Sequence, residues 1–497
     1  MKQRMLICLA GAATALTIGL FVLAGCGGGG GPILVPGNAA ASVSALFLQL
    51  LPAAQSSASY VGTAKCQSCH TDQYHSNWKV TRHAQVGTGC EQCHGPGSVH
   101  AQNRTASLVK ADILTYPNVT EPIVCGQCHG PIFDQLNNSR HAGAVADVIA
   151  SAHANPAGGK TCLRCHGAPL RTQFINATWT QGKLQNLSET TIQNQADTAI
   201  TSLTNAQIDA FATASHQSAN CVTCHDPHTR TGNLLASGEE KQLRRATFSI
   251  DPTPILPGSA TKVTSNLNHI CGTCHNGRGG DPSDAALLKA SSTARPNFHE
   301  GPSFNMLLGV TGSLPPGTVI QHSSHADAPD QCVHCHMPDA RHTFTVSLDT
   351  SCQPCHTAAD AAARESSVRD EVLTGLLVLR TRLESWAQTK FANSAFWDYY
   401  SLVDEDPAVQ AESKAIQDQI PIEIRRVRHN YYFIIRDRSF GIHNTPYTRQ
   451  LLFYSHSLLD SLGVSRAAVP KSRAQILDVI KRDLWRSIKS DIHEDAT

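Results

Sequence analysis

The sequence predicts a mainly α protein with much irregular loop and a helical bundle at its C-terminal end. Residues up to about 357 are rich in Gly, Pro, Asn and Thr and contain few long periodic runs, which favours short helices joined by loops and almost no sheet. Residues 358–497 carry apolar side chains at helical spacing instead. The third observation is a short unit, Cys-x-x-Cys-His, that recurs eight times in the loop-rich part.

Composition excludes some functions. The chain has 497 residues and a formal net charge of +1, so it lacks the strong positive charge of a nucleic-acid binder. Aromatic residues make up only 6%, which leaves a thin core for this length. Sixteen of the 18 cysteines fall in the eight units, so a disulfide framework is not expected.

The first segment, residues 1–25, has the features of a secretory signal. A positively charged start precedes the apolar run Met5–Ala24. The sequence Leu23-Ala24-Gly25-Cys26 resembles a bacterial lipobox, in which Cys26 is lipidated; the alternative is a transmembrane anchor with an incidental Cys. Residues 26–59 begin with a Gly run and predict a flexible tether. We therefore expect an exported lipoprotein held on the membrane by a lipid anchor.

The eight units occupy residues 60–357, and each is typical of a c-type haem attachment site. Two thiols at positions i and i+3 reach the haem vinyl groups, and the adjacent His binds the iron. A zinc site is one alternative interpretation of the Cys-x-x-Cys pairs, but zinc does not require a His directly after the second Cys. A thioredoxin-like redox pair is another, but such a pair would occur once rather than eight times. We expect eight covalently attached haem c groups. The attachment cysteines are Cys66, Cys69, Cys90, Cys93, Cys125, Cys128, Cys162, Cys165, Cys221, Cys224, Cys271, Cys274, Cys332, Cys335, Cys352 and Cys355, and the proximal histidines are His70, His94, His129, His166, His225, His275, His336 and His356.

A second axial ligand is needed for each low-spin iron, and His is the usual one in electron carriers. Seventeen of the 25 histidines lie outside the units, so each is either a distal ligand or an ordinary loop residue. Position favours His83, His100, His141, His228, His325 and His342. We expect His75, His334, His429, His456 and His493 to be non-ligands.

From about His299 to Leu452 the sequence resembles the octahaem cytochromes related to pentahaem cytochrome c nitrite reductase, which include hydroxylamine oxidoreductase and tetrathionate reductase. The markers are Gly312 to His325, Cys332-Val333-His334-Cys335-His336-Met337-Pro338, His342, Cys352-Gln353-Pro354-Cys355-His356-Thr357, Ser439-Phe440-Gly441-Ile442-His443-Asn444-Thr445-Pro446 and Leu451-Leu452. The start, Tyr60 to Cys66 with Trp78 and His83, is similar to the cytochrome c-554 type. Family members place three haems before a five-haem core, which implies a multihaem cytochrome c fold with closely packed haems.

The resemblance also implies the distal ligands. His342 would serve the Cys221/Cys224 haem, His141 the Cys271/Cys274 haem, His443 the Cys332/Cys335 haem and His325 the Cys352/Cys355 haem. His83, His100 and His228 remain for the first three haems, in an order left open. The Cys162/Cys165 haem corresponds to the family's substrate-binding haem, and either its distal face is open or His153, His216 or His299 closes it.

Two functions remain. The first is a conduit that passes electrons by haem-to-haem hopping between other cytochromes or redox proteins, toward periplasmic or extracellular acceptors at the outer membrane. The second is an octahaem oxidoreductase acting on nitrite, hydroxylamine or sulfur oxyanions, with His299 as the candidate catalytic residue. Departures from the family favour the conduit. His166 stands where family reductases often carry Lys, and Asn276-Gly277-Arg278 stand near the place of their catalytic Tyr.

The C-terminal region, residues 358–497, predicts a helical bundle. One apolar stripe comprises Val372, Leu376, Leu379, Leu383 and Trp386, a second Ile416, Ile420, Ile424, Val427, Tyr431 and Ile434, and a third Tyr447, Leu451, Tyr454, Leu458 and Leu462. A last helix is expected from Pro470 through Trp485. These stripes pack on one another and on the haem region, or they form a homo-oligomer interface. We expect Arg425, Arg426 and Arg428 to make a solvated or propionate-pairing face.

Overall fold

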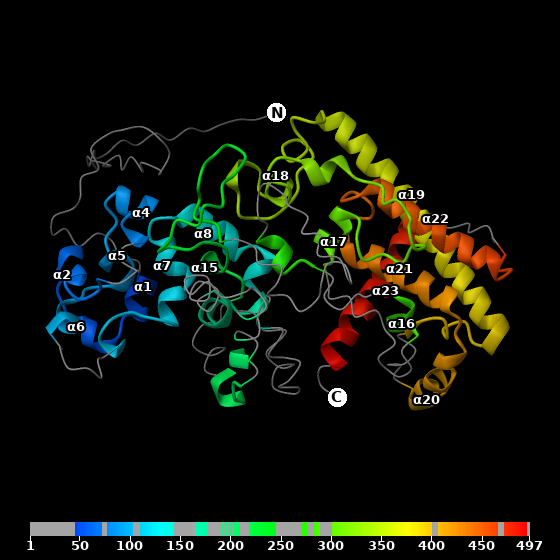
Figure 1. Ribbon diagram of the computed structural model, residues 1–497, viewed down its shortest axis with the longest axis horizontal. Helices are drawn as coiled ribbons and strands as arrows, with labels where there is room; N and C mark the ends of the chain where they lie inside the picture. The colour runs from blue at the N-terminus through cyan, green and yellow to red at the C-terminus, as the bar shows by residue number, and fades with distance from the viewer. Residues whose placement is uncertain are drawn as a thin grey trace, which may run out of the picture. The chain divides into compact units, whose positions relative to one another are not determined.

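Short helical turns make up the motif-bearing part of the chain, and long helices make up the part after Ala358 (Figure 1). The computed structural model describes residues 45–71, 77–102, 110–143, 163, 165–176, 191, 195, 198–200, 202–208, 218–244, 270–276, 282–288, 301–399, 406–465 and 472–494. The signal peptide and lipidation site predicted at residues 1–26 lie outside these ranges, as do Cys162, His153, His216 and His299. All described residues belong to one unit, Ser42–Thr497.

The short elements carry or flank most of the described cysteine motifs and candidate ligands. The α-helices are α1 (Ala45–Leu50), α2 (Thr63–Gln67), α4 (Arg82–Gln85), α5 (Glu91–His94), α6 (Ser98–Gln102), α7 (Pro122–Gly126), α8 (Gly130–Asn137), α11 (Ala168–Leu170), α15 (Cys221–Cys224), α16 (Asp284–Leu287), α17 (Ser303–Leu308) and α18 (Cys332–His336). The remaining turns are η1 (Ala53–Ser57), η2 (Lys110–Asp112), η3 (Asn118–Thr120), η4 (Arg140–Ala142), η5 (Arg171–Asn176), η7 (Cys271–Thr273), η8 (Ser324–Asp327) and η9 (Pro338–Ala340). Within the described ranges, extended pairing is limited to the isolated bridges His225–Leu243 and Leu234–Glu240. The predicted mainly α fold with irregular loops is confirmed.

The longest helix is α19, which runs from Ala358 to Phe391. It begins where the side chain of Thr357 accepts a hydrogen bond from the Asp360 backbone N–H, an ordinary N-cap. It ends at Ala392, whose left-handed backbone (φ 57°) breaks the helical repeat. The first predicted stripe lies on this helix, and four of its five side chains, Val372, Leu376, Leu379 and Leu383, are fully buried.

Four further helical elements complete the C-terminal bundle. They are α20 (Pro407–Ile416) with its turn η11 (Gln417–Gln419), α21 (Ile422–Asp437), α22 (Thr445–Ser461) and α23 (Arg473–Glu494). The second predicted stripe does not lie on one helix, because Pro421 separates α20 from α21 and a proline cannot continue a helical hydrogen-bond ladder. Its side chains are buried nevertheless. The predicted last helix begins at Arg473 rather than Pro470.

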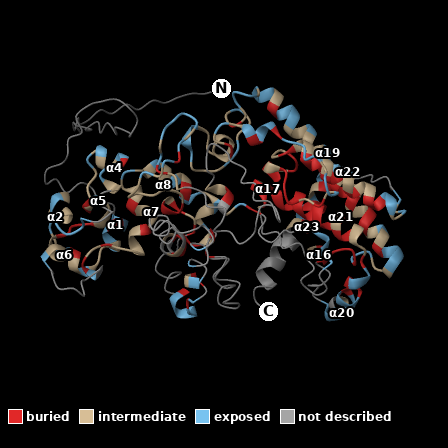
Figure 2. Cartoon of the chain, in the orientation of Figure 1, coloured by how far each residue is buried: buried red, intermediate tan, exposed pale blue. Residues whose placement is uncertain are grey.

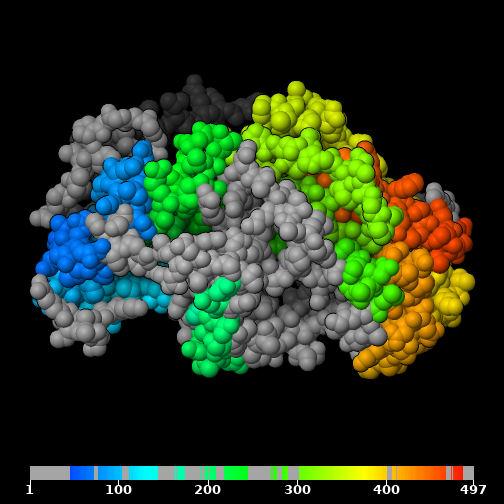
Figure 3. Space-filling view, in the orientation of Figure 1, coloured from blue at the N-terminus to red at the C-terminus, as the bar shows by residue number. Residues whose placement is uncertain are grey.

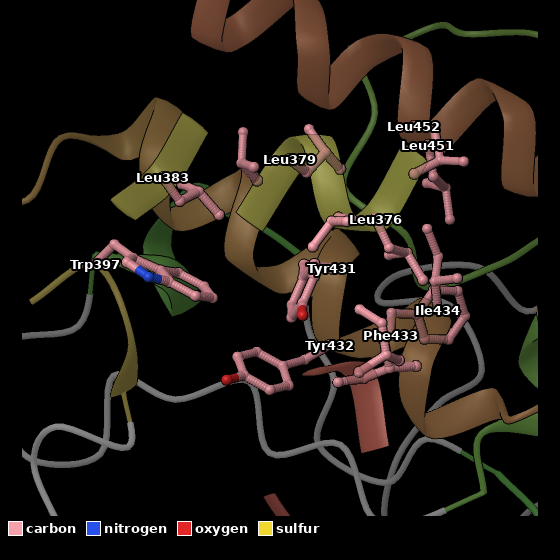
Figure 4. Close-up of a cluster of buried hydrophobic side chains, with 14 of the residues drawn as sticks. Leu376, Leu379, Leu383, Trp397, Tyr431, Tyr432, Phe433, Ile434, Leu451 and Leu452 are labelled. Carbon is pink, nitrogen blue, oxygen red and sulfur yellow. The ribbon is translucent and has the colours of Figure 1, made fainter. Parts of the chain in front are cut away.

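The core lies where α19, α21, α22 and α23 pack together (Figure 2). Leu376 and Leu379 on α19, Tyr431 and Ile434 on α21 and Leu451 on α22 point into one apolar cluster (Figure 4). The three predicted stripes therefore pack largely on one another within a single chain. Burial of this apolar surface is the main stabilising contribution in the described residues.

Of the two alternatives for the α21 arginines, a solvated or a propionate-pairing face, the solvated one is wrong for Arg425 and Arg428. Arg425 and Arg428 are only 2% and 0% exposed. Arg425 donates hydrogen bonds to the carbonyl oxygens of Ile420 and Leu287, both at 2.9 Å. Arg426 pairs with Asp284 at 2.7 Å. The Arg425 guanidinium donates hydrogen bonds to carbonyl oxygens of two different segments. The order of charged residues in the sequence does not show that such contacts form.

The segment 301–321 joins the bundle to the motif-bearing part. The backbone N–H of Ser313 donates to Asn430 Oδ1 at 2.7 Å, and that of Gly312 donates to the Tyr447 hydroxyl at 2.8 Å. A Cβ at Gly312 would overlap Leu451 and this hydroxyl, so the close approach requires glycine there. In Figure 3 the yellow-green surface of residues 301–350 borders the orange-red surface of α22.

Candidate haem centres

Pairs of imidazole rings are the main feature of the motif-bearing region. In each pair one ring belongs to the His of a Cys-x-x-Cys-His unit and the other to a His outside the units. The distances between ring centroids are 6.3 Å for His70–His100, 6.1 Å for His94–His228, 6.2 Å for His83–His129, 6.3 Å for His225–His342, 6.0 Å for His141–His275, 6.2 Å for His336–His443 and 6.4 Å for His325–His356. The seven centroid distances differ by only 0.4 Å, which indicates that all seven pairs are arranged in the same way.

The structure brings together the residues that the resemblance paired. His342 faces His225, His141 faces His275, His443 faces His336 and His325 faces His356. It also supplies an order for the three histidines that the sequence left open: His100 faces His70, His228 faces His94 and His83 faces His129.

Hydrogen bonds determine which nitrogen of these imidazole rings is free to bind a metal. Nδ1 contacts a backbone carbonyl oxygen in His94 (Leu114, 2.8 Å), His225 (Lys241, 2.8 Å), His325 (Ile442, 2.7 Å), His336 (Phe344, 3.2 Å) and His342 (Ala340, 2.9 Å). Since a carbonyl only accepts, Nδ1 must carry the proton and donate. The other nitrogen, Nε2, is then unprotonated in the neutral ring, as a metal ligand requires.

Two rings of the set donate to carboxylates instead. His443 Nδ1 lies 2.6 Å from Asp437 Oδ1, and His356 Nδ1 lies 2.8 Å from Asp360 Oδ2. Neither Asp was predicted from the sequence as part of the site. A signal was present for Asp360, because it follows His356 by one helical turn at the start of α19. Asp437 ends α21, and only the turn before α22 brings it to His443.

Burial keeps several of these histidines neutral. Removal from water lowers the pKa of His225, His228 and His275 to about 4 each, because the imidazolium form loses its hydration. Burial would also lower the pKa of His443, but the carboxylate of Asp437 raises it above its ordinary value. The neutral form is the one that can bind a metal through Nε2.

Cysteines from different units lie against one another and so order the units in space. The Cys66 thiol hydrogen-bonds to that of Cys90, which raises the pKa of Cys66 and lowers that of Cys90. Cys125 contacts Cys221 in the same way, and Cys271 contacts Cys332.

Electrostatic contacts join the remaining neighbours. Burial and the adjacent Cys128 thiol raise the pKa of Cys93 to about 11, and burial and Cys271 raise that of Cys224 to about 12. Burial and Cys352 likewise raise the pKa of Cys335 to about 11. The spatial order of units is therefore Cys66/Cys69, Cys90/Cys93, Cys125/Cys128, Cys221/Cys224, Cys271/Cys274, Cys332/Cys335 and Cys352/Cys355.

Of the Cys162/Cys165 unit, the structure describes Leu163, Cys165 and His166. Cys165 is buried, and His166 lies close enough to His275 to affect its pKa. Burial, followed by the imidazoles of His141, His336 and His166, lowers the pKa of His275. Asn276, in the place expected for a catalytic Tyr, is buried and donates to the Gly272 carbonyl oxygen at 2.9 Å.

The described ranges contain no disulfide, no multi-ligand metal site and no membrane-spanning helix. The described cysteines of the units form no disulfides with one another. No three or more His, Cys, Asp or Glu side chains converge there as a multi-ligand metal site would require. Among the same residues, no helix has the length and apolar character to cross a bilayer.

The chain matches no protein-family model. It is similar to the C-type polyheme cytochrome OmcC of Geobacter sulfurreducens, with 24% identity over 228 residues that cover 37% of this chain and 28% of the relative. It is also similar to the C-type polyheme cytochrome OmcB of the same organism, with 27% identity over 235 residues that cover 44% of this chain and 25% of the relative. The chain thus spans about a quarter of the length of these curated relatives.

Two solved structures are similar as well. The undecaheme cytochrome from the S-layer of Carboxydothermus ferrireducens has a TM-score of 0.44 and 20% identity, with coverage of 77% of this chain and 51% of that chain. The outer cell wall cytochrome OcwA has a TM-score of 0.43 and 17% identity, with coverage of 75% and 70%.

Proposed function

We propose that the protein is an exported multihaem c-type cytochrome that carries electrons by hopping between eight covalently attached haem c groups. The observation that carries this proposal is the set of seven imidazole pairs, each with one motif His and ring centroids 6.0–6.4 Å apart. The similarity to polyheme cytochromes of Geobacter sulfurreducens supports it independently.

The residues present fit a haem iron. Two imidazoles with ring centres about 6 Å apart accommodate one metal atom bonded at about 2 Å to a nitrogen of each ring. The carbonyl oxygens and carboxylates that accept from Nδ1 leave Nε2 for that bond. In every unit, two thiols three residues apart precede the motif His, which is the covalent requirement of haem c.

The bound haem supplies the reversible one-electron chemistry of its iron. At seven of the eight units the chain holds two imidazoles in place for the iron, so the coordination shell there would change little when the iron is oxidised or reduced. Three thiol contacts join units in pairs, and electrostatic interactions between further cysteines link these pairs, so the seven ordered centres lie close together. An electron entering at either end of the order has a near neighbour at each step.

We prefer the conduit to a substrate-converting octahaem enzyme because the sequence departs from the family reductases at two places. The fourth unit ends in His166 where they often carry Lys, and Asn276-Gly277-Arg278 stand near the place of their catalytic Tyr. Asn276 donates to the Gly272 carbonyl oxygen of its own turn. The three-plus-five arrangement of the octahaem superfamily accounts for the number of units. Redox partners would be other cytochromes or acceptors in the periplasm or outside the cell.

We also propose that Cys26 carries a lipid anchor that holds the protein at the outer membrane. The support is the sequence Leu23-Ala24-Gly25-Cys26 followed by a run of glycines.

The proposed homo-oligomer would form through the C-terminal helices. Because the apolar stripes of these helices are already buried within one chain, the contact would use their outer faces.

The deciding experiment counts haems in protein made in a host that matures c-type cytochromes. A pyridine haemochrome assay should return close to eight haems per chain, and haem should stay attached on a denaturing gel. The double variant Cys125→Ala/Cys128→Ala should lose one haem and keep the others. Five or fewer haems in the wild type, or stoichiometric zinc, would refute the proposal.

A further inference from the structure

The imidazole hydrogen bonds distinguish two groups among the four centres for which the structure gives an Nδ1 partner. Where the structure gives an Nδ1 partner for the units up to Cys221/Cys224, that partner is a neutral backbone carbonyl oxygen. In the Cys332/Cys335 and Cys352/Cys355 centres, one ring of each pair donates to a carboxylate. These two centres are neighbours in space, because the Cys335 thiol lies beside those of Cys352 and Cys355.

We propose that Asp437 and Asp360 lower the reduction potentials of these two neighbouring haems and so make them the low-potential end of the conduit. This inference rests on the proposed function. A carboxylate that accepts from Nδ1 gives the imidazole imidazolate character and makes Nε2 a stronger donor. Its negative charge also favours Fe(III) over Fe(II). Reduction adds one electron to the iron, and the Nδ1 proton stays between the imidazole and the carboxylate.

Asp437 is placed to have the larger effect. Its side chain is only 1% exposed, so water screens its charge little. It lies at the C-terminal end of α21, where the helix dipole disfavours a negative charge. Its hydrogen bonds come from the Ser439 hydroxyl and from His443 Nδ1. Burial of a carboxylate destabilises the fold unless hydrogen bonds offset the lost hydration. Asp437 reaches the candidate haem centre through its hydrogen bond with His443 Nδ1.

Asp360 is the weaker of the two. Its side chain is 42% exposed, and Arg364 Nε lies 2.8 Å from both of its oxygens. The guanidinium offsets most of the negative charge, and solvent screens the rest. The two carboxylates therefore differ in strength. Asp437 is buried and accepts hydrogen bonds from Ser439 and His443, whereas Asp360 is exposed and paired with Arg364.

The test is EPR-monitored potentiometric titration of the purified holoprotein and its variants, after the haem count has been measured. Asp437→Asn keeps an acceptor for His443 Nδ1 but removes the charge. One haem potential should then rise by about 59 mV, a tenfold change in its one-electron equilibrium constant. Asp437→Glu, which restores the charge, should return the potential toward the wild-type value. Asp360→Asn should change the constant of a different haem by no more than about threefold.

Two further variants separate tuning from structural support. Ser439→Ala removes a donor that disperses the Asp437 charge, so it should shift the same haem in the opposite direction. Asp398→Asn alters a buried carboxylate of the same bundle that binds Tyr432 rather than a haem His, and it should leave all potentials unchanged. If Asp437→Asn retains every low-spin haem but moves no potential, Asp437 only positions His443 and the inference fails. A wild-type protein without haem would instead refute the proposed function.

Discussion

The imidazole of His443 lies 6.2 Å from that of His336, although one follows the end of α21 and the other belongs to a cysteine motif. This pair connects the C-terminal bundle to the motif-bearing region. The His443 ring is held by Asp437, and its backbone N–H donates to the Ser439 hydroxyl at 3.2 Å. The turn between α21 and α22 is therefore part of the candidate site as well as of the bundle.

Replacement of this ring should open one centre. His443→Ala should convert one haem of the set from low-spin to high-spin or open coordination, because His336 alone would remain. It should also lower the thermal stability of the bundle, since a link to the motif region is lost. EPR and thermal melting measure the two effects.

The matched control is His322→Ala. His322 is an exposed histidine whose side chain is 62% accessible and whose partner is Asp327. That variant should match the wild type in both measurements. An unchanged low-spin spectrum in His443→Ala would show that His443 is only a helix-linker residue.

Added small ligands should bind few of the haem irons, because few have a vacant axial position. With seven imidazole pairs in place, cyanide added to the oxidised protein should bind rapidly to at most one haem per chain. That haem would be the one at Cys162/Cys165. Optical and EPR titration give the stoichiometry. Rapid binding at two or more haems would contradict the pairing.

Turnover tests the enzyme alternative at the same centre. Reduced viologen should show no nitrite- or hydroxylamine-dependent oxidation by the purified protein. Turnover that disappears in His299→Ala would overturn the conduit and make the protein a reductase.

Core truncation should destabilise the bundle. Leu376 is a fully buried residue of α19, which packs against α22, so Leu376→Ala should cost about 2–5 kcal/mol through lost apolar contacts and the cavity left behind. Phe453→Ala on α22 is the control, because Phe453 is 76% exposed and its loss should change stability by no more than about 0.5 kcal/mol. Denaturant unfolding of the two variants measures both effects. Equal decreases in the free energy of unfolding of the two variants would show that Leu376 is not part of the stabilising core.

A buried arginine also supports the bundle. The side chain of Arg382 is 0% exposed, and it donates to Asp460 and to the Val464 carbonyl oxygen, each at 2.6 Å. Arg382→Ala should cost about 1–3 kcal/mol, because it leaves the part-buried carbonyl oxygens of His456 and Val464 without their donor, whereas Asp460 is 42% exposed and is hydrated by solvent. Arg364→Ala removes an exposed arginine from the same helix and should change stability little. A small loss in Arg382→Ala would show that water replaces the guanidinium.

The proposed anchor is testable by fractionation. Cys26→Ala should release the protein from membranes or leave an uncleaved precursor, because only Cys at that position accepts the lipid. Metabolic labelling with a fatty acid, compared between wild type and variant, measures the modification directly. A variant that matures and fractionates like the wild type would contradict the anchor.

The sequence by itself determined the features that are local in the chain. Each Cys-x-x-Cys-His unit fits in five residues, so its chemistry can be identified without a fold. The stripe from Val372 to Leu383 follows from helical periodicity in the same way, and the structure confirms it.

Only the tertiary structure decided relationships between distant segments. It placed His100 opposite His70, His228 opposite His94 and His83 opposite His129, an order that the sequence left open. It also buried Arg425 and Arg428, and it brought Asp437 to His443. Residue type and local spacing specify what a side chain can bind, whereas its actual partner depends on how the connecting loops and helices pack in space.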